Sequence, residues 1–330
     1  MALGIGPGDE VVTPPTSWIS TAEAVSLVGA TAVWADIDAR TYHLRPDALR
    51  AALSPATRAV IAVSLFGAAV DGPALRAVLD AHTAAAGGGD RRPIALIEDG
   101  AQSFGATTPA GVRSCCPGVA AGVTVGVTSF FPTKPLGGWG DGGAVFVADG
   151  ALAAGVRARR VHGRAGAGGH TVVGLNGRLD ALQAAVVGVK LRDMDRLVAA
   201  RRAVAAVYAA LLGADARVVL PTDGGGGHVF GVYTVRVRAR DGVAARLKAD
   251  GVATAVYYRV NMHQQPVYAG GVAPSRRGGP LDVAEAVAAE VLSLPMGAFL
   301  RRDAQERVAQ RLRAALDAEG VTEPPPTHAV

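Results

Sequence analysis

The sequence predicts an α/β fold in which a mostly parallel sheet, covered by helices, forms a large domain and a smaller α+β domain follows. Two observations predict this fold. Between Glu10 and His162, short runs rich in β-branched residues alternate with helical patterns, as in parallel sheets with crossover helices. The chain also has 330 residues, of which 50% are hydrophobic, so it is long enough for about two domains with large cores.

The expected strands of the large domain are Glu10–Thr13, Ala32–Asp36, Ala59–Leu65, Ile94–Glu98, Thr124–Ser129 and Ala144–Ala148. The helices expected between them are Thr21–Val28, Pro46–Leu53, Gly72–His82 and Ala151–His162. In such a sheet the ligand crevice lies at the carboxyl ends of the strands. Candidate functional residues are therefore sought where strands end.

The pattern changes after Arg178, where one long helical run extends to Leu212. We expect a large domain over residues 1–200 and a small one over residues 201–330. The runs Gly87–Gly89 and Gly224–Gly227 are predicted to be a surface loop and a flexible break. The elements expected in the small domain are strands Val229–Val237 and Thr254–Tyr258 and helices Val243–Asp250, Val283–Leu292 and Arg302–Ala318, before a frayed tail.

Charge and cysteine content exclude several classes of protein. The 33 basic and 28 acidic residues give a net charge of +5 without a basic stripe, so we expect no nucleic-acid partner. Cys115 and Cys116 are adjacent and cannot link distant segments. We find no membrane span and no signal peptide, and therefore expect a cytoplasmic protein.

Lys134 is the most informative of the three lysines in the chain. Lys190 and Lys248 fit the solvated faces of helices. Lys134 instead follows an apolar strand, lies between Pro132 and Pro135, and precedes a glycine-rich turn. Burial near a crevice would lower the pKa of its amine and make it nucleophilic. The alternative is a turn lysine in solvent.

The carboxylates Glu98 and Asp99 come where the strand after Pro93 ends. An acid at this edge of the sheet could bind a metal, a ribose or a protonated ring nitrogen. Together with Lys134, an acid at this position suits a pyridoxal phosphate site. There the lysine forms a Schiff base with the cofactor, and the acid keeps the pyridine nitrogen protonated.

The segments SFFPTKPLGGWGDGGAVF, EDGAQSFGA, NGRLDALQAA and GVATAVYY resemble the DegT/DnrJ/EryC1/StrS family of nucleotide-sugar aminotransferases. The resemblance extends from Leu3 to Leu300 and implies the fold-type-I architecture with pyridoxal 5'-phosphate as cofactor. The sequences of these segments are similar to those of the subgroup that aminates UDP-2-acetamido-2-deoxy-3-oxo-glucuronate in O-antigen and related polysaccharide pathways.

The resemblance implies roles for residues around the cofactor ring. Lys134 would carry the cofactor and shuttle a proton between the cofactor and the substrate carbon. Asp99 would pair with the pyridinium nitrogen, and Gln102 would lie beside the ring. Trp18 would stack on the ring face by area and π contact; the alternative is an ordinary core tryptophan.

The resemblance also implies contacts with the phosphate, the substrate and a second subunit. Ser129 would bind the cofactor phosphate, and Asn176 would reach the phosphate of the neighbouring subunit, which implies a homodimer with shared sites. Arg178 would grip a uronate carboxylate, unless it only caps or pairs on the long helix. His263 would lie near the site entrance, unless it is a surface-loop histidine. No metal site is predicted.

The chain departs from the family in two places. Family members carry roughly sixty more residues at the front, including a Gly-Ser/Thr turn at a helix N-terminus that binds the cofactor phosphate. We therefore expect a segment to be missing before Met1. Where the subgroup has a His-Tyr pair after SLPM, this chain has Gly297, Ala298 and Phe299.

The predicted reaction is a ping-pong transamination from L-glutamate to a keto sugar nucleotide. One alternative is a truncated, non-catalytic relative that acts as a binding or assembly protein. Another is an aminotransferase for a 4-keto deoxysugar or a cyclitol. Cofactor titration tests the first alternative, and a panel of keto sugars tests the second.

Overall fold

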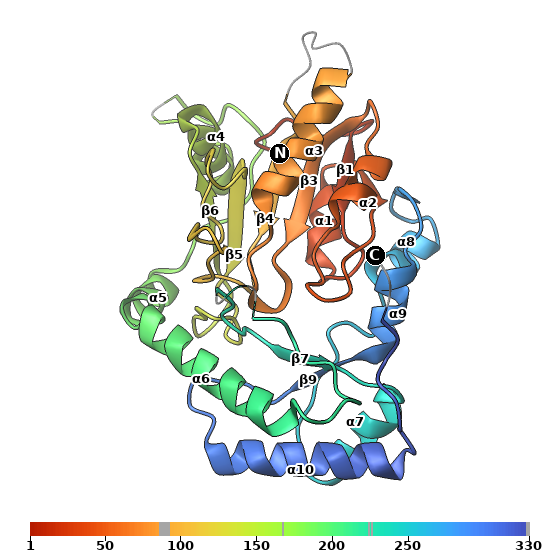
Figure 1. The fold of residues 1–330 in the computed structure, drawn as a ribbon. Coiled ribbons are helices and arrows are strands. Elements are labelled where there is room, and N and C mark those ends of the chain that lie inside the picture. The colour runs from red at the N-terminus through yellow and green to blue at the C-terminus, as the bar shows by residue number, and fades with distance from the viewer. Residues whose placement is uncertain (86–92, 167, 224, 226, 328–330) are drawn as a thin grey trace.

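The computed structural model describes residues 1–85, 93–166, 168–223, 225 and 227–327 (Figure 1). A large sheet with its helices forms the upper part of the view, and a smaller unit around β7 and β9 lies below it. The predicted surface loop Gly87–Gly89 and two residues of the predicted break, 224 and 226, lie outside the described residues.

The large sheet has seven strands in the order β6-β5-β4-β3-β1-β2-β8, and all neighbours are parallel except β5 and β6. The strands are β1 (Glu10–Thr13), β2 (Thr31–Trp34), β3 (Thr57–Val63), β4 (Ala95–Asp99), β5 (Val125–Ser129), β6 (Gly143–Val147) and β8 (Ser275–Arg277). The predicted mostly parallel sheet is confirmed. The short, polar β8 was not predicted, and it brings a segment of the C-terminal part of the chain to the large sheet.

Helices cover both faces of this sheet, so successive strand residues pack into different cores. Val11 packs with Trp34 and Ile61 in one core, while its neighbour Val12 packs with Leu96 in another. The helices of this part are α1 (Ser20–Leu27), α2 (Pro46–Ala52), α3 (Gly72–Ala85), α4 (Gly150–Arg160) and α5 (Ala181–Arg192), with the 3₁₀ turn η1 (Leu65–Gly67). The first four of these helices lie close to their predicted positions.

The smaller unit has its own core, in which Tyr208, Tyr233 and Leu312 are almost fully buried. Its elements are α6 (Met194–Leu212), β7 (Tyr233–Arg236), α7 (Arg240–Ala249), β9 (Val291–Leu294) and α10 (Arg302–Ala318). Between α7 and β9 the chain runs through η2 (Met262–Gln264), α8 (Pro266–Ala269), β8 and α9 (Asp282–Glu290). The C-terminal part therefore contributes to both units.

Four predicted elements differ in the structure. Of the predicted strand Val229–Val237, only Tyr233–Arg236 forms β7. The long helical run breaks at Asp193, which has non-helical backbone angles, into α5 and α6. The predicted helix Val283–Leu292 ends at Glu290 because Val291 adopts an extended conformation and begins β9. Residues 254–258 do not form the predicted strand; only Ala255 makes a bridge, to Ser293.

The C-terminal tail is less frayed than predicted. Arg236 donates from Nη2 to the carbonyl oxygen of Pro326 at 3.0 Å. Arg238 donates from Nε to the carbonyl oxygen of Pro324 at 2.6 Å. These two arginines of the β7 region therefore hold the tail against the smaller unit up to the last described residues. Within the described chain, no helix combines the length and the hydropathy needed to cross a membrane.

The turn after Lys134 is tight, and this explains its glycines. The Gly138 N–H donates to the Phe130 carbonyl at 2.7 Å, and the Lys134 N–H donates to the Phe131 carbonyl at 2.9 Å. A Cβ on Gly137 would lie 2.4 Å from the carbonyl oxygen of Pro132. Lys190 on α5 is half-buried and donates to the Gly137 carbonyl. The prediction of a solvated Lys190 is therefore wrong, whereas Lys248 is exposed as expected.

We predict that Gly137→Ala lowers the free energy of unfolding by about 1–3 kcal/mol, because the new methyl group overlaps backbone that cannot move freely. Chemical denaturation measures this change. Gly150→Ala is the matched control, since a Cβ there meets nothing within 4 Å, and it should leave stability unchanged or raise it slightly. Equal stability of the two variants would contradict the packing argument.

Candidate active site

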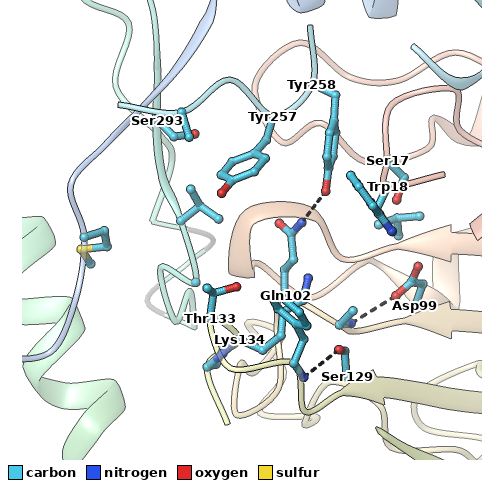
Figure 2. A pocket seen from close by; sticks show the side chains of 18 of the residues that line it. Ser17, Trp18, Asp99, Gln102, Ser129, Thr133, Lys134, Tyr257, Tyr258 and Ser293 are labelled. Carbon is cyan, nitrogen blue, oxygen red and sulfur yellow. Dashed lines mark hydrogen bonds between the residues drawn. The ribbon is translucent and has the colours of Figure 1, made fainter. Parts of the chain in front are cut away.

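A cavity of about 770 Å³ lies where the large sheet meets the smaller unit. Figure 2 shows Asp99, Gln102, Ser129 and Lys134 along one side and Tyr257, Tyr258 and Ser293 along the other. The first group lies at or just after the carboxyl ends of strands β4 and β5, as the fold class predicts. Five of the eight predicted site residues line this cavity: Trp18, Asp99, Gln102, Ser129 and Lys134.

The alternation of side chains along β4 separates its two terminal acids. Glu98 points away from the Lys134 cavity and is buried, where it accepts hydrogen bonds from the hydroxyls of Ser64 and Ser114, each at 2.6 Å, and from the Cys115 N–H at 2.7 Å. Asp99 faces the cavity. Its Oδ1 accepts from the Ala101 N–H at 3.2 Å, and its Oδ2 accepts from the Thr21 hydroxyl at 2.8 Å. Asp99 is thus the acid available to a ligand, and Glu98 is structural.

Lys134 is half-buried and lines the cavity. It lies in the loop that begins after Ser129, near Pro135. Burial lowers the pKa of its amine, and the negative charge of Asp99 opposes this effect. The effect of Asp99 exists because the two groups lie close enough to interact along the same side of the cavity. A lysine with a lowered pKa has a larger neutral, nucleophilic fraction at physiological pH. The alternative of a fully solvated turn lysine is therefore wrong.

Gln102 has a fixed orientation. Its Oε1 accepts a hydrogen bond from the Phe66 N–H at 2.8 Å, so its Nε2 is the donor to the hydroxyl of Tyr258 at 3.1 Å. This contact joins the large sheet to the 254–258 segment across the cavity (Figure 2). Sequence reasoning placed Tyr258 on a strand and assigned it no role. The signal that could have revealed it is the pair of adjacent tyrosines in a segment rich in small residues.

Trp18 is not a core tryptophan. Its side chain is 59% exposed and lines the cavity from the loop between β1 and α1. Its ring centroid lies 6.3 Å from that of Tyr258, with the planes tilted by 43°. The exposed indole of Trp18 therefore offers a flat aromatic face to a planar ligand.

Ser129 is the last residue of β5 and is predicted to bind the cofactor phosphate. Its Oγ accepts a hydrogen bond from the Phe131 N–H at 3.1 Å. The hydroxyl proton is thereby left for a different acceptor, since a serine hydroxyl both accepts and donates.

Asn176 and Arg178 do not line the cavity of their own chain. Both are exposed, and Arg178 makes no hydrogen bond or ion pair with the described residues. The alternative that Arg178 only caps or pairs on the long helix is therefore not supported. Asn176 pairs through its backbone with Val161, at the end of α4.

His263 also lies away from the cavity and is buried, so the alternative of a surface-loop histidine is wrong. Its Nε2 lies 2.9 Å from Oε1 of Glu285, and its ring lies 6.4 Å from that of Trp34. The prediction that His263 contacts substrate gains no support from this placement. Phe299, in the segment that departs from the subgroup, is exposed.

The cavity residues fit pyridoxal phosphate by the chemistry of their donor groups. A half-buried amine, a carboxylate acceptor and an aromatic face surround one space. These are the three partners that the aldehyde, the ring nitrogen and the ring face of this cofactor require. Lys134, Asp99 and Trp18 would hold the corresponding parts of the cofactor.

Comparison with known proteins shows the family to which the chain belongs. The model of the DegT/DnrJ/EryC1/StrS aminotransferase family matches residues 1–313. A UDP-2-acetamido-2-deoxy-3-oxo-D-glucuronate aminotransferase from Pseudomonas aeruginosa is 43% identical over 300 residues, which are 91% of this chain and 77% of that protein.

Two solved structures share the fold. A DegT DnrJ EryC1 StrS aminotransferase from Brucella abortus has a TM-score of 0.85 and 32% identity, covering 95% of this chain and 81% of its own. NtdA from Bacillus subtilis with bound cofactor PMP has a TM-score of 0.82 and 26% identity, covering 96% of this chain and 69% of its own. The chain thus belongs to the DegT/DnrJ/EryC1/StrS aminotransferase family and is a pyridoxal phosphate-dependent aminotransferase.

Proposed function

We propose that this enzyme transfers the amino group of L-glutamate to a keto sugar nucleotide, with UDP-2-acetamido-2-deoxy-3-oxo-glucuronate as the substrate. The observation that carries the proposal is that the Lys134 amine and the Asp99 carboxylate open into one cavity. The substrate is taken from the Pseudomonas aeruginosa relative, which is 43% identical. The product would enter surface polysaccharide biosynthesis, and the cytoplasm remains the expected location.

Bound pyridoxal phosphate supplies an electron sink for the substrate carbon that gains or loses a proton. Lys134 would hold the aldehyde carbon of the cofactor through Nζ, and its neutral amine would carry a proton between that carbon and the substrate carbon. Asp99 would accept a charge-assisted hydrogen bond from the ring nitrogen. Trp18 and Gln102 would hold the ring in place, and Ser129 would donate to the phosphate.

The cavity of one chain holds too few cations for this substrate. Among the described residues that line it, Lys134 is the one basic side chain, whereas Asp99 and Asp141 are acidic. A cofactor phosphate, a diphosphate and a uronate together bring several negative charges. Basic side chains from elsewhere are therefore needed to bind them.

We propose that a second copy of the chain provides these groups. Several basic side chains lie on α4 and in the segment up to Arg178, none of the residues of α4 is buried, and Arg178 itself is exposed. Beside it lie exposed apolar side chains on the 172–175 loop and on α5, of which Val173 is 80% and Leu182 80% exposed. Such a face is typical of an interface between subunits. Asn176 and Arg178 would then reach the partner's cavity.

Borohydride reduction tests the role of Lys134. After loading with pyridoxal phosphate and reduction, we expect mass spectrometry to find the cofactor on the peptide that contains Lys134. Lys190 and Lys248 serve as internal controls, because one is engaged by the Gly137 carbonyl and the other is exposed on α7. Label spread over all three lysines, or absent from Lys134, would refute the assignment.

Hybrid dimers test the role of Arg178 at the partner's site. A hybrid of one Lys134→Ala chain and one Arg178→Ala chain contains one intact site if Arg178 acts across the interface, so about half of the wild-type activity per dimer should return. The control pairs a wild-type chain with a Lys134→Ala/Arg178→Ala chain, which should be inactive. The reverse pattern, with an inactive hybrid and a half-active control, would place Arg178 in the site of its own chain.

The pKa of Lys134 also predicts a pH dependence of stability for the cofactor-free protein. Because burial lowers this pKa from 10.5, the unfolded chain binds more protons, and stability rises with pH through this window. Relative to Lys134→Met, the wild type should be least stable near pH 7 and should approach the variant toward pH 10.5. Denaturant titrations across this range measure the difference, and a constant difference would contradict the lowered pKa.

A further inference from the structure

Thr21 links two of the groups that surround the proposed cofactor ring. Its hydroxyl donates to Oδ2 of Asp99 at 2.8 Å. Its backbone N–H donates to the carbonyl oxygen of Trp18 at 3.1 Å. Thr21 is 5% exposed, lies in the first turn of α1, and does not itself line the cavity.

Ser17 completes this arrangement and fixes the direction of its protons. Its Oγ lies 2.9 Å from Oγ1 of Thr21. Because the Thr21 proton is directed to the Asp99 carboxylate, the Ser17 hydroxyl must donate to Thr21. Both hydroxyls are buried, so water does not readily replace either of them.

The carboxylate of Asp99 is thereby held at both oxygens. Oδ1 accepts from the Ala101 N–H at 3.2 Å, and Oδ2 accepts from Thr21. A carboxylate bound only through Oδ1 could turn about its terminal bond, since such sp³–sp² torsions have broad minima. The Thr21 hydroxyl removes this freedom and fixes which lone pairs face the cavity.

We propose that Thr21 is a positioning residue of the active site, which aims the Asp99 carboxylate at the ring nitrogen while it holds the segment that carries Trp18. This inference rests on the proposed roles of Lys134 and Asp99. It adds a group on α1 that touches neither cofactor nor substrate. Ser17 is the second member of the arrangement and acts through Thr21.

The expected consequence is spectroscopic. A well-aimed Asp99 keeps the ring nitrogen protonated, and a protonated ring withdraws electrons from the nitrogen that joins Lys134 to the cofactor. Without the Thr21 hydroxyl the ring is protonated less often, so the nitrogen that joins Lys134 to the cofactor keeps its own proton to a higher pH. The pKa of this nitrogen, which the visible absorbance band reports, therefore rises. One hydrogen bond to a charged group is worth about tenfold in an equilibrium constant, which corresponds to about one pKa unit.

The experiment is a pH titration of the visible band in the cofactor-loaded protein, together with the dissociation constant for pyridoxal phosphate. Thr21→Val nearly preserves shape, and we expect its band pKa to rise by about one unit and its dissociation constant by about tenfold. Thr21→Ser keeps the hydroxyl and should restore both values to within about twofold. Ser17→Ala should show a smaller shift in the same direction.

Ser26→Ala is the matched control on the same helix. The Ser26 hydroxyl bonds the Ala22 carbonyl and lies 3.1 Å from the Tyr268 hydroxyl, away from the cavity. It should leave the band unchanged, even if thermal stability falls. A Thr21→Val band that titrates like the wild type, or a Thr21→Ser band that is shifted equally, overturns the inference. A wild-type protein without any visible band overturns the proposed function instead.

Discussion

The carboxyl ends of neighbouring parallel strands meet at one edge of the large sheet, and this constraint brings together groups that are far apart in the chain. Asp99 is the last residue of β4 and pairs in register with Val127 of β5. Two residues later Ser129 ends β5, and the chain turns at once into the loop that carries Lys134. The loop after β1 brings Trp18 and Thr21 to the same edge. The distance from acid to amine is therefore set by strand order and by one tight turn.

The electrostatics of the cavity follow from the same arrangement. Burial of the Lys134 amine lowers its pKa, while the negative charge of Asp99 limits the shift. The cavity gains a reactive amine in this way but offers little positive charge to anionic ligands. If two copies associate, the basic residues around Arg178 would supply this positive charge. The exposed apolar side chains of α5 would form the contact between the subunits. Catalysis and assembly would then be linked, because the described residues that line the cavity of one chain include a single basic side chain.

Much of the large domain could be predicted from local pattern. The strand β1 was predicted at its observed bounds. A proline-flanked lysine and a strand-end acid are each weak signals, and only the pair suggested a pyridoxal phosphate site. The choice of Asp99 over Glu98 came from the family resemblance. Other features depend on contacts between distant segments. The three-residue strand β8 forms only because β2 offers an edge, and residues 254–258 lose strand structure where their side chains line the cavity.

Side-chain networks were the hardest part to predict. Lys190 looked like a solvated helix residue, yet it supports the turn after Lys134. His263 looked like an entrance residue, but its partner Glu285 holds it in the core. Thr21 gave no local signal, because its role depends on Asp99, which is 78 positions away in the chain. The periodicity of a segment reports which face is buried, but not which polar groups meet there.

The central claim is that the Lys134 amine and the Asp99 carboxylate hold opposite ends of one cofactor ring. A crystal structure of the chain with pyridoxal phosphate measures this most directly. The account predicts continuous density between Nζ of Lys134 and the cofactor, with the ring nitrogen about 2.7–3.2 Å from an oxygen of Asp99. Cofactor bound away from Lys134, or a ring nitrogen that faces solvent rather than Asp99, would contradict it.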